Sequence, residues 1–350
     1  MSVDSSVVFS NLRCAPFHVA LDVDPIGSGG CYDAYLCVEI PLPWERDISG
    51  NEPFASLCEA PSASIVGSDG RKWRPQGLVP EAGRGDVVQV LAFEQPARAS
   101  TGRSGSSFER REWLVPPERV SELCAALLKA DDEAIGGLGE FEVAANASDG
   151  GGTPEQRTSE LFICTHGQRD VCCGGSGTSL YTALSQLLGD GDGGGHPGEG
   201  LTLRRVSHTG GHRFAPTALS FPDGYAWSHL DQRMALAVAT RAVEPAEVLG
   251  HIRGSTLFKG GPSQVADRHG LGEVGWAWAD AHRSVELIGF DRRSMATDVL
   301  VQGELADGTN RAFEVRVGIE RHVPQITCGI IDSPEYKVEP VWRVEEARAL

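Results

Sequence analysis

Short apolar runs and helical stripes alternate along the chain, and together they predict a mixed α/β protein. In the first part, strand-like runs cover residues 17–21, 34–38 and 87–91. A helix is expected after Pro116-Pro117, because apolar residues recur there at helical spacing from 120 to 128.

The middle of the chain shows the order strand, helix, strand, hairpin, helix. Strands are expected at 161–163 and 201–206, and a helix between them starts near Thr178-Ser179, whose hydroxyls are typical of an N-cap. Two short runs over 218–227 flank a Pro-Asp-Gly turn and predict a hairpin. A helix over 231–243 closes the unit. A crossover unit, an antiparallel pair and a closing helix make a thioredoxin-like layout.

We expect the chain to consist of three parts, the first two separated by a glycine-rich linker. Residues 148–153 read Ser-Asp-Gly-Gly-Gly-Thr, which is typical of a flexible joint. We therefore expect an N-terminal α/β segment of unknown role over 1–153 and a thioredoxin-like domain over 154–265. The remainder, 266–350, is expected to be a strand-rich extension, because apolar runs flank a hairpin signal at 306–309. The expected fold class is α/β (α+β).

Composition and charge limit which partners and which cellular location are expected for the protein. The 350 residues carry a net charge of −17, and such an acidic protein repels phosphate backbones, so no nucleic-acid partner is expected. Acidic balance suits docking on a basic partner, although solubility alone is its ordinary cause. No apolar run is long enough to span a bilayer, and the first residues lack a signal-peptide pattern. We expect a cytoplasmic protein with no membrane partner.

The nine cysteines do not form a disulfide pattern, since their number is odd and they are scattered. Most are expected to be ordinary buried residues. Cys124 belongs to the helical stripe, and Cys328 has no partner motif. Only the cysteines between 164 and 173 have a spacing and surroundings that indicate metal binding or a reactive thiol.

Two loops hold the candidate chemistry. The first leaves the end of the strand at 161–163 and returns before a helix, which is where α/β proteins place sites. It contains three cysteines, and thiolates there gain from the helix dipole and Arg169. In the second loop, 207–216, two glycines separate His208 from His212 and let both imidazoles turn the same way. Thiolates and imidazoles together are a recognised set of metal ligands.

Other residues of the first loop are expected to be structural. We expect Arg169 and Asp170 to pair and brace the loop, and His166 to bond a backbone carbonyl. Several known redox patterns are absent: Cys-x-x-Cys, the plant-type ferredoxin spacing and the dinucleotide-binding glycine motif. Cys164-Thr165-His166 matches the first half of a Rieske motif, but no later cysteine supplies the second half.

The two loops closely resemble those of the sucrase/ferredoxin-like family, thioredoxin-like ferredoxins related to the yeast actin-patch-distribution protein. The resemblance rests on Ile163-Cys164-Thr165-His166-Gly167, Arg169-Asp170 and Cys173-Gly174, and on His208-Thr209-Gly210-Gly211-His212-Arg213-Phe214-Ala215. Weaker matches extend it over about residues 30–270. They include Cys37-Val38-Glu39 to Pro43-Trp44, Phe221-Pro222-Asp223-Gly224 and Arg253-Gly254-Ser255.

The resemblance implies a 2Fe–2S cluster held by two cysteines and two histidines. The family positions fall on Cys164, Cys173, His208 and His212, and the Cys-x8-Cys spacing selects Cys173 over its neighbour Cys172. The implied function is electron transfer, as a component of an oxidoreductase system that receives electrons from a reductase and passes them to an unknown acceptor. The chain shows no carboxylate pair in a setting that would support glycoside hydrolysis.

Two alternatives use the same residues. The four ligands could instead hold zinc in a structural or interaction module, since two cysteines and two histidines are also a zinc set. Alternatively, Cys172 or Cys173 could be the nucleophile of a thiol enzyme, which would require a low thiol pKa.

Overall fold

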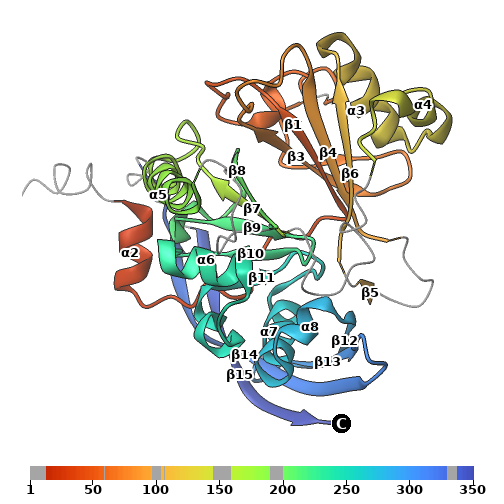
Figure 1. The fold of residues 1–350 in the computed structure, drawn as a ribbon. Coiled ribbons are helices and arrows are strands. Elements are labelled where there is room, and N and C mark those ends of the chain that lie inside the picture. Colours follow the sequence, from red (N-terminus) through yellow and green to blue (C-terminus); the bar gives the residue numbers. More distant parts are fainter. Residues whose placement is uncertain are drawn as a thin grey trace, which may run out of the picture.

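The computed structural model describes residues 13–58, 60–96, 104–105, 107–144, 159–189, 200–328 and 337–350. The glycine-rich joint expected at 148–153 lies outside these residues. The class is mixed α/β, as predicted, with one large mixed sheet and a second antiparallel sheet (Figure 1).

The large sheet joins the first and middle parts of the chain. Its strand order is β11-β10-β9-β7-β8-β3-β1-β4-β6, and β3 and β8 meet through the antiparallel pair Leu78 and Val206. Its first part consists of β1 Ala34–Glu39, β2 Ile65–Val66, β3 Lys72–Leu78, β4 Val88–Glu94 and β6 Glu109–Val115. Its second part consists of β7 Ser159–Cys164, β8 Leu201–Val206, β9 Ala218–Phe221, β10 Tyr225–Trp227 and β11 Ile252–Ser255. The expected domain boundary at 153 stays a prediction, but the sheet continues across it.

The middle part has the predicted order of elements. Strands β7 and β8 are parallel and are connected by α5, Thr178–Leu188, while β9 pairs antiparallel to β7 and β10 to β9. Helix α6, Gln232–Thr240, follows the hairpin. Residues Leu161, Phe162 and Ile163 are all fully buried, as expected of a strand covered on both faces.

Helices cover the first part of the sheet on one face. Helix α3, Val120–Lys129, carries the predicted stripe, and α4, Asp132–Gly136, lies beside it (Figure 1). Leu123, Cys124 and Leu127 pack against Leu36, Val90 and other residues of β1 and β4. The predicted strands at 34–38 and 87–91 and the predicted helix after Pro117 are confirmed.

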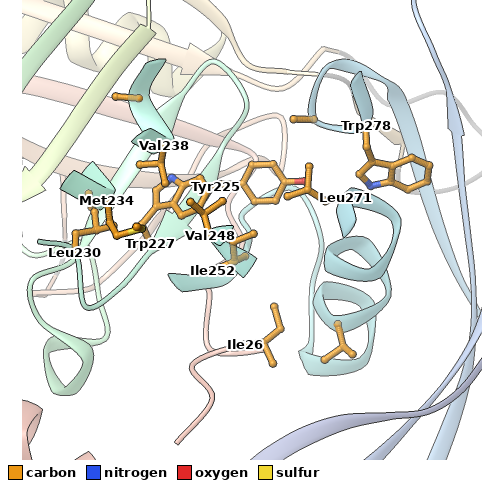
Figure 2. Close-up of a cluster of buried hydrophobic side chains, with 14 of the residues drawn as sticks. Ile26, Tyr225, Trp227, Leu230, Met234, Val238, Val248, Ile252, Leu271 and Trp278 are labelled. Atoms are coloured by element: carbon orange, nitrogen blue, oxygen red, sulfur yellow. The ribbon is translucent and has the colours of Figure 1, made fainter. Parts of the chain in front are cut away.

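The C-terminal part is strand-rich, as predicted, and shares a core with the middle part. It contains α7 Gly261–Val274, α8 Trp276–Asp280, β12 His282–Asp291, β13 Ala296–Glu304, β14 Asn310–Gln325 and β15 Lys337–Ala349, and β12 also pairs with β5 Ser104–Gly105. Figure 2 shows Leu271 of α7 next to Tyr225 of β10, and Trp278 and Ile252 belong to the same cluster. The same cluster includes Val299 of β13, so this part extends the middle core.

Two local predictions were wrong. Residues 17–21 were expected to form a strand, but Cys14–Ala20 is helix α2, whose buried residues Cys14, Ala15 and His18 recur at helical spacing. The apolar residue Val19 made the segment resemble a half-buried strand, but its side chain is 60% exposed.

The second wrong prediction is the helix cap. Neither Thr178 nor Ser179 caps a helix start, because helical structure already begins at Val171 and passes through a wide π-turn over Cys173–Gly177.

No helix in the described part of the chain has the length and apolar character required to cross a membrane. The expected cytoplasmic location stays a prediction.

Candidate metal centre

The two candidate loops emerge at the same edge of the large sheet. Cys164 is the last residue of β7 and Val206 the last of β8, and these residues are register partners in a parallel pair. The loops that follow them therefore start side by side, as the sequence predicted. The second loop ends in a short 3-10 helix over His212–Phe214.

Cys164, Cys173 and His208 come together at this edge. One potential ligand atom from each lies within 4.8 Å of the others. Both cysteine side chains are completely buried, whereas His208 is half-buried. We call these three residues the Cys164 group.

Glycines allow the close approach that places Cys173 against Cys164. A methyl group on Gly177 would overlap the carbonyl oxygen of Cys164, and one on Gly174 would overlap the Cα of Gly167. The start of the helix can therefore pack directly on the end of β7 only with these small residues.

Glycines also shape the histidine loop, as predicted. Gly210 and Gly211 have φ values of +89° and +66°, which glycine adopts without strain. The buried Arg253 packs on Gly211 and donates hydrogen bonds to the carbonyls of Gly210 (3.0 Å) and Ser28 (2.7 Å). This turn holds His208 and His212 on the same side of the loop, with ring centroids 5.9 Å apart.

Hydrogen bonding and burial shift the pKa values of all three side chains of the Cys164 group. Hydrogen bonds from Cys173 and His208 outweigh burial and lower the pKa of Cys164 well below its ordinary value. The same pairing with Cys164, together with burial, raises the pKa of Cys173. Burial lowers the pKa of His208, so its imidazole stays neutral. Its Nδ1 is buried and has no hydrogen-bond partner among the described residues.

His212, the fourth predicted ligand, lies at the border of this group. Its Nδ1 is 3.1 Å from Oδ2 of Asp170 and 3.2 Å from Sγ of Cys14. The structure therefore brings three of the four predicted residues into one compact group and places the fourth beside it, facing a buried carboxylate.

A second cluster, which the sequence did not predict, lies next to His212. Sγ of Cys328 is 3.3 Å from Sγ of Cys172 and 3.4 Å from Sγ of Cys14, and Sγ of Cys14 is 3.7 Å from Oδ1 of Asp170. Potential ligand atoms of these four residues all lie within 4.8 Å of one another. We call them the Cys14 group. Cys328, which has no partner motif in the sequence, meets its partners in this cluster only through the fold.

Local spacing could not reveal the Cys14 group, because its cysteines come from α2, from the helix start that follows the first loop and from the segment after β14. Positions 14 and 328 are 314 residues apart. A hydrogen bond from the Cys14 thiol lowers the pKa of Cys172 to about 6 despite burial. The pKa of Cys14 is correspondingly raised.

Asp170 does not pair with Arg169, which corrects the sequence prediction. The Asp170 carboxylate accepts a hydrogen bond from the Cys172 amide (2.8 Å) and faces His212. Burial opposes ionisation of the Asp170 carboxyl. The hydrogen bond with His212 and the electrostatic attraction of that ring outweigh burial and hold the pKa of Asp170 at about 2. Arg169 instead lies 3.8 Å from a carboxylate oxygen of Asp47.

His166 is structural, as predicted. Its Nε2 bonds the carbonyl of Glu45 at 2.9 Å, and its Nδ1 accepts the backbone N–H of His208 at 3.2 Å. His166 therefore links the two loops through main-chain contacts and helps to position His208.

The comparisons with known proteins agree with the resemblance seen in the two loops. No curated protein and no solved structure matches the chain. The family model described as sucrase/ferredoxin-like matches residues 25–254, which include both loops and the whole Cys164 group. Because this match covers well over half of the 350 residues, the chain belongs to the sucrase/ferredoxin-like family.

Proposed function

We propose that the chain binds a 2Fe–2S cluster through Cys164, Cys173, His208 and His212 and acts as an electron-transfer protein. When bound, the cluster would accept and release electrons one at a time. The chain itself supplies the ligands. It would keep water from the buried cysteine ligands and leave the histidine ligands accessible to partner proteins.

The observation that carries the proposal is the meeting of two buried cysteines with a neutral histidine whose Nδ1 is buried and unpartnered in the described part of the chain. An unsatisfied buried nitrogen is costly unless another group binds it. Thiolate sulfur and neutral imidazole are ligands of iron–sulfur centres that use both residue types. The donor set therefore fits the proposed group.

The position of His212 supports a centre larger than one ion. Its Nδ1 faces Asp170 at 3.1 Å, so its Nε2 is the nitrogen that remains for a metal. A carboxylate that accepts the other ring N–H is the usual partner of a metal-bound histidine. Two irons can accept ligands that are more widely spaced than the ligands of a single ion.

The accessible side of the site would set the electron path. Cys164 and Cys173 are buried, but His208 lines a small surface cleft together with Arg46, Arg74 and Arg169. Arg74 is buried, and Asp47, which lies 3.8 Å from Arg169, lines the same cleft, so the rim of the cleft carries charges of both signs. We propose that the donor reductase and the acceptor approach along this rim.

The direct test is a visible spectrum of protein purified without oxygen, with iron and sulfide counts. We expect a red-brown protein with two irons and two sulfides per chain. The Cys164→Ser variant should be colourless, whereas Cys58→Ser, which changes a cysteine outside both groups, should keep the full spectrum. A colourless wild-type protein without iron would overturn the proposal.

The metal and sulfide content of the same purified protein distinguishes a 2Fe–2S cluster from a zinc ion bound by the same residues. Three compact ligands in the Cys164 group would also suit one zinc ion. In that case the wild type would contain zinc and no sulfide, and Cys164→Ser would release that zinc.

A further inference from the structure

The Cys14 group shares no residue with the four residues proposed to hold the cluster, but it contacts one of them: Nδ1 of His212 lies 3.2 Å from Sγ of Cys14 and 3.1 Å from Oδ2 of Asp170. The three sulfurs and one carboxylate of the Cys14 group come from three distant segments, and Cys14, Cys172 and Asp170 are buried. Of the nine cysteines, only those of the two groups meet in a cluster that also includes an acidic or imidazole side chain, within the described residues.

We propose that Cys14, Cys172 and Cys328, with the carboxylate of Asp170, form a second metal site that binds one zinc ion. This inference does not depend on the cluster, because it rests on different side chains. Thiolates and a carboxylate oxygen are ordinary zinc ligands, and four protein ligands without an open position are typical of a structural zinc site.

The distances suit a tetrahedral ion. A zinc–sulfur bond of about 2.3 Å separates two sulfurs of a tetrahedral site by about 3.8 Å. The observed separations are 3.3 Å between Cys172 and Cys328 and 3.4 Å between Cys14 and Cys328. The ion would therefore require the sulfurs to open by only a few tenths of an ångström. The carboxylate oxygens of Asp170 already lie 3.7 and 3.8 Å from Sγ of Cys14.

The polar surroundings also favour a bound cation. The backbone N–H of Cys14 points to Sγ of Cys328 at 3.2 Å, a contact that stabilises a thiolate. In the described part of the chain, no arginine or lysine forms an ion pair with the buried Asp170 carboxylate, which faces a ring nitrogen of His212 instead. A cation among these groups would add a positive charge beside this buried carboxylate, whose present stabilising contacts are the Cys172 amide and His212.

A disulfide explains the arrangement less well. A disulfide between Cys328 and either of its neighbours would leave the sulfur of Cys14 or of Cys172 buried beside a carboxylate. The site also lies close to a surface cleft of about 990 Å³ between α2 and the loop after β7, because Cys172 lines that cleft. Zinc there would tie α2 and the segment after β14 to the loop that carries Cys173.

The experiment measures iron and zinc together, by elemental analysis of the full-length protein purified without added metal or chelator. We expect about one zinc per chain besides the iron. The Cys14→Ser and Cys328→Ser variants should lose most of the zinc, roughly ten-fold or more, and keep the iron and the visible spectrum. Cys58→Ser is the matched control and should keep both metals. Cys164→Ser should lose the iron and keep the zinc.

Several outcomes would overturn the second site. One is wild-type protein without zinc that also fails to bind added zinc under reducing conditions. Another is a disulfide between Cys172 and Cys328 in the purified protein, detected by mass spectrometry before and after reduction. A third is loss of iron in Cys14→Ser and Cys328→Ser, which would make these residues ligands of the cluster. If the wild type has no iron but Cys14→Ser still releases zinc, the second site stands and the proposed electron-transfer function fails.

Discussion

Oδ2 of Asp170 lies 3.1 Å from Nδ1 of His212, so a buried carboxylate of the Cys14 group contacts the proposed ligand that lies beside the Cys164 group. Because Nδ1 of His212 makes this contact, its other ring nitrogen, Nε2, is directed away from Asp170. The contact also places a negative charge one hydrogen bond away from a proposed iron ligand. The carboxylate is therefore expected to tune the metal centre as well as to orient the ring.

We predict that Asp170→Asn raises the reduction potential of the proposed cluster. The amide removes a negative charge beside His212, and less negative charge near the iron favours the reduced form. Retention of iron against a chelator should weaken by about 10- to 100-fold, as is typical when the outer partner of a metal-bound histidine is lost. A redox titration followed in the visible spectrum measures the potential.

The matched control is Asp298→Asn, which removes a carboxylate paired with Arg316 on the C-terminal sheet. This variant should keep the wild-type potential. The Asp170→Asn variant and the wild type are compared at equal zinc content, because Asp170 is also a proposed zinc ligand. A potential in Asp170→Asn that is then unchanged, or lower than in the wild type, would show that Asp170 does not act on the centre through His212.

A second prediction separates the two adjacent cysteines. Cys173→Ser should abolish the cluster, because its side chain belongs to the buried Cys164 group. Cys172→Ser should keep it, because Sγ of Cys172 faces Cys328 at 3.3 Å instead. Iron and sulfide counts on both variants decide the assignment. Loss of iron in Cys172→Ser with retention in Cys173→Ser would shift the assignment by one residue.

A third prediction concerns the close packing between the wide helical turn and β7. In Gly177→Ala the new methyl group would overlap the carbonyl oxygen of Cys164, whereas a methyl group on Gly175 meets no atom within 4 Å. Gly177→Ala should lower the free energy of unfolding by about 1–3 kcal/mol and reduce the iron content. Gly175→Ala should keep both. Chemical denaturation and iron counts measure the pair, and equal behaviour of the two variants would exclude the steric argument.

The sequence was most informative where the relevant signal is local. The apolar run 161–163, the loop after it and the Gly-Gly pair before His212 each lie within a few residues, and parallel strands bring the ends of such segments together. This is why the strand order around β7 and the positions of Cys164, Cys173 and His208 could be predicted.

The remaining features depend on contacts between distant segments. Nothing near Cys14 or Cys328 in the sequence indicates that they meet, since their approach follows from how α2 and the end of β14 pack on the loop after β7. The strand predicted at 17–21 failed for a related reason. An alternating pattern cannot show that His18 is buried against Phe214 while Val19 is exposed.

A last prediction concerns pH and His229, which follows β10. This residue has a left-handed backbone (φ +49°), donates its N–H to the carbonyl of Phe214 (2.9 Å), and packs its ring against Phe214. Burial, and then the nearby His251 and His18, lower the pKa of His229 to about 4. The folded protein therefore keeps this ring neutral over a range in which the unfolded chain protonates it.

Stability should consequently fall as the pH drops below about 6.5, because there the unfolded state binds more protons than the folded state. The loss grows until the pH reaches about 4, where the folded ring also titrates. Its limit is about 3 kcal/mol for this one group. In His229→Asn the side chain does not titrate, and asparagine tolerates the left-handed backbone. Between pH 7 and 4.5 the variant should therefore lose less unfolding free energy than the wild type. Denaturation of both proteins in the same buffers cancels the contributions of the other titrating groups, and parallel pH profiles would show that His229 is not buried in its neutral form.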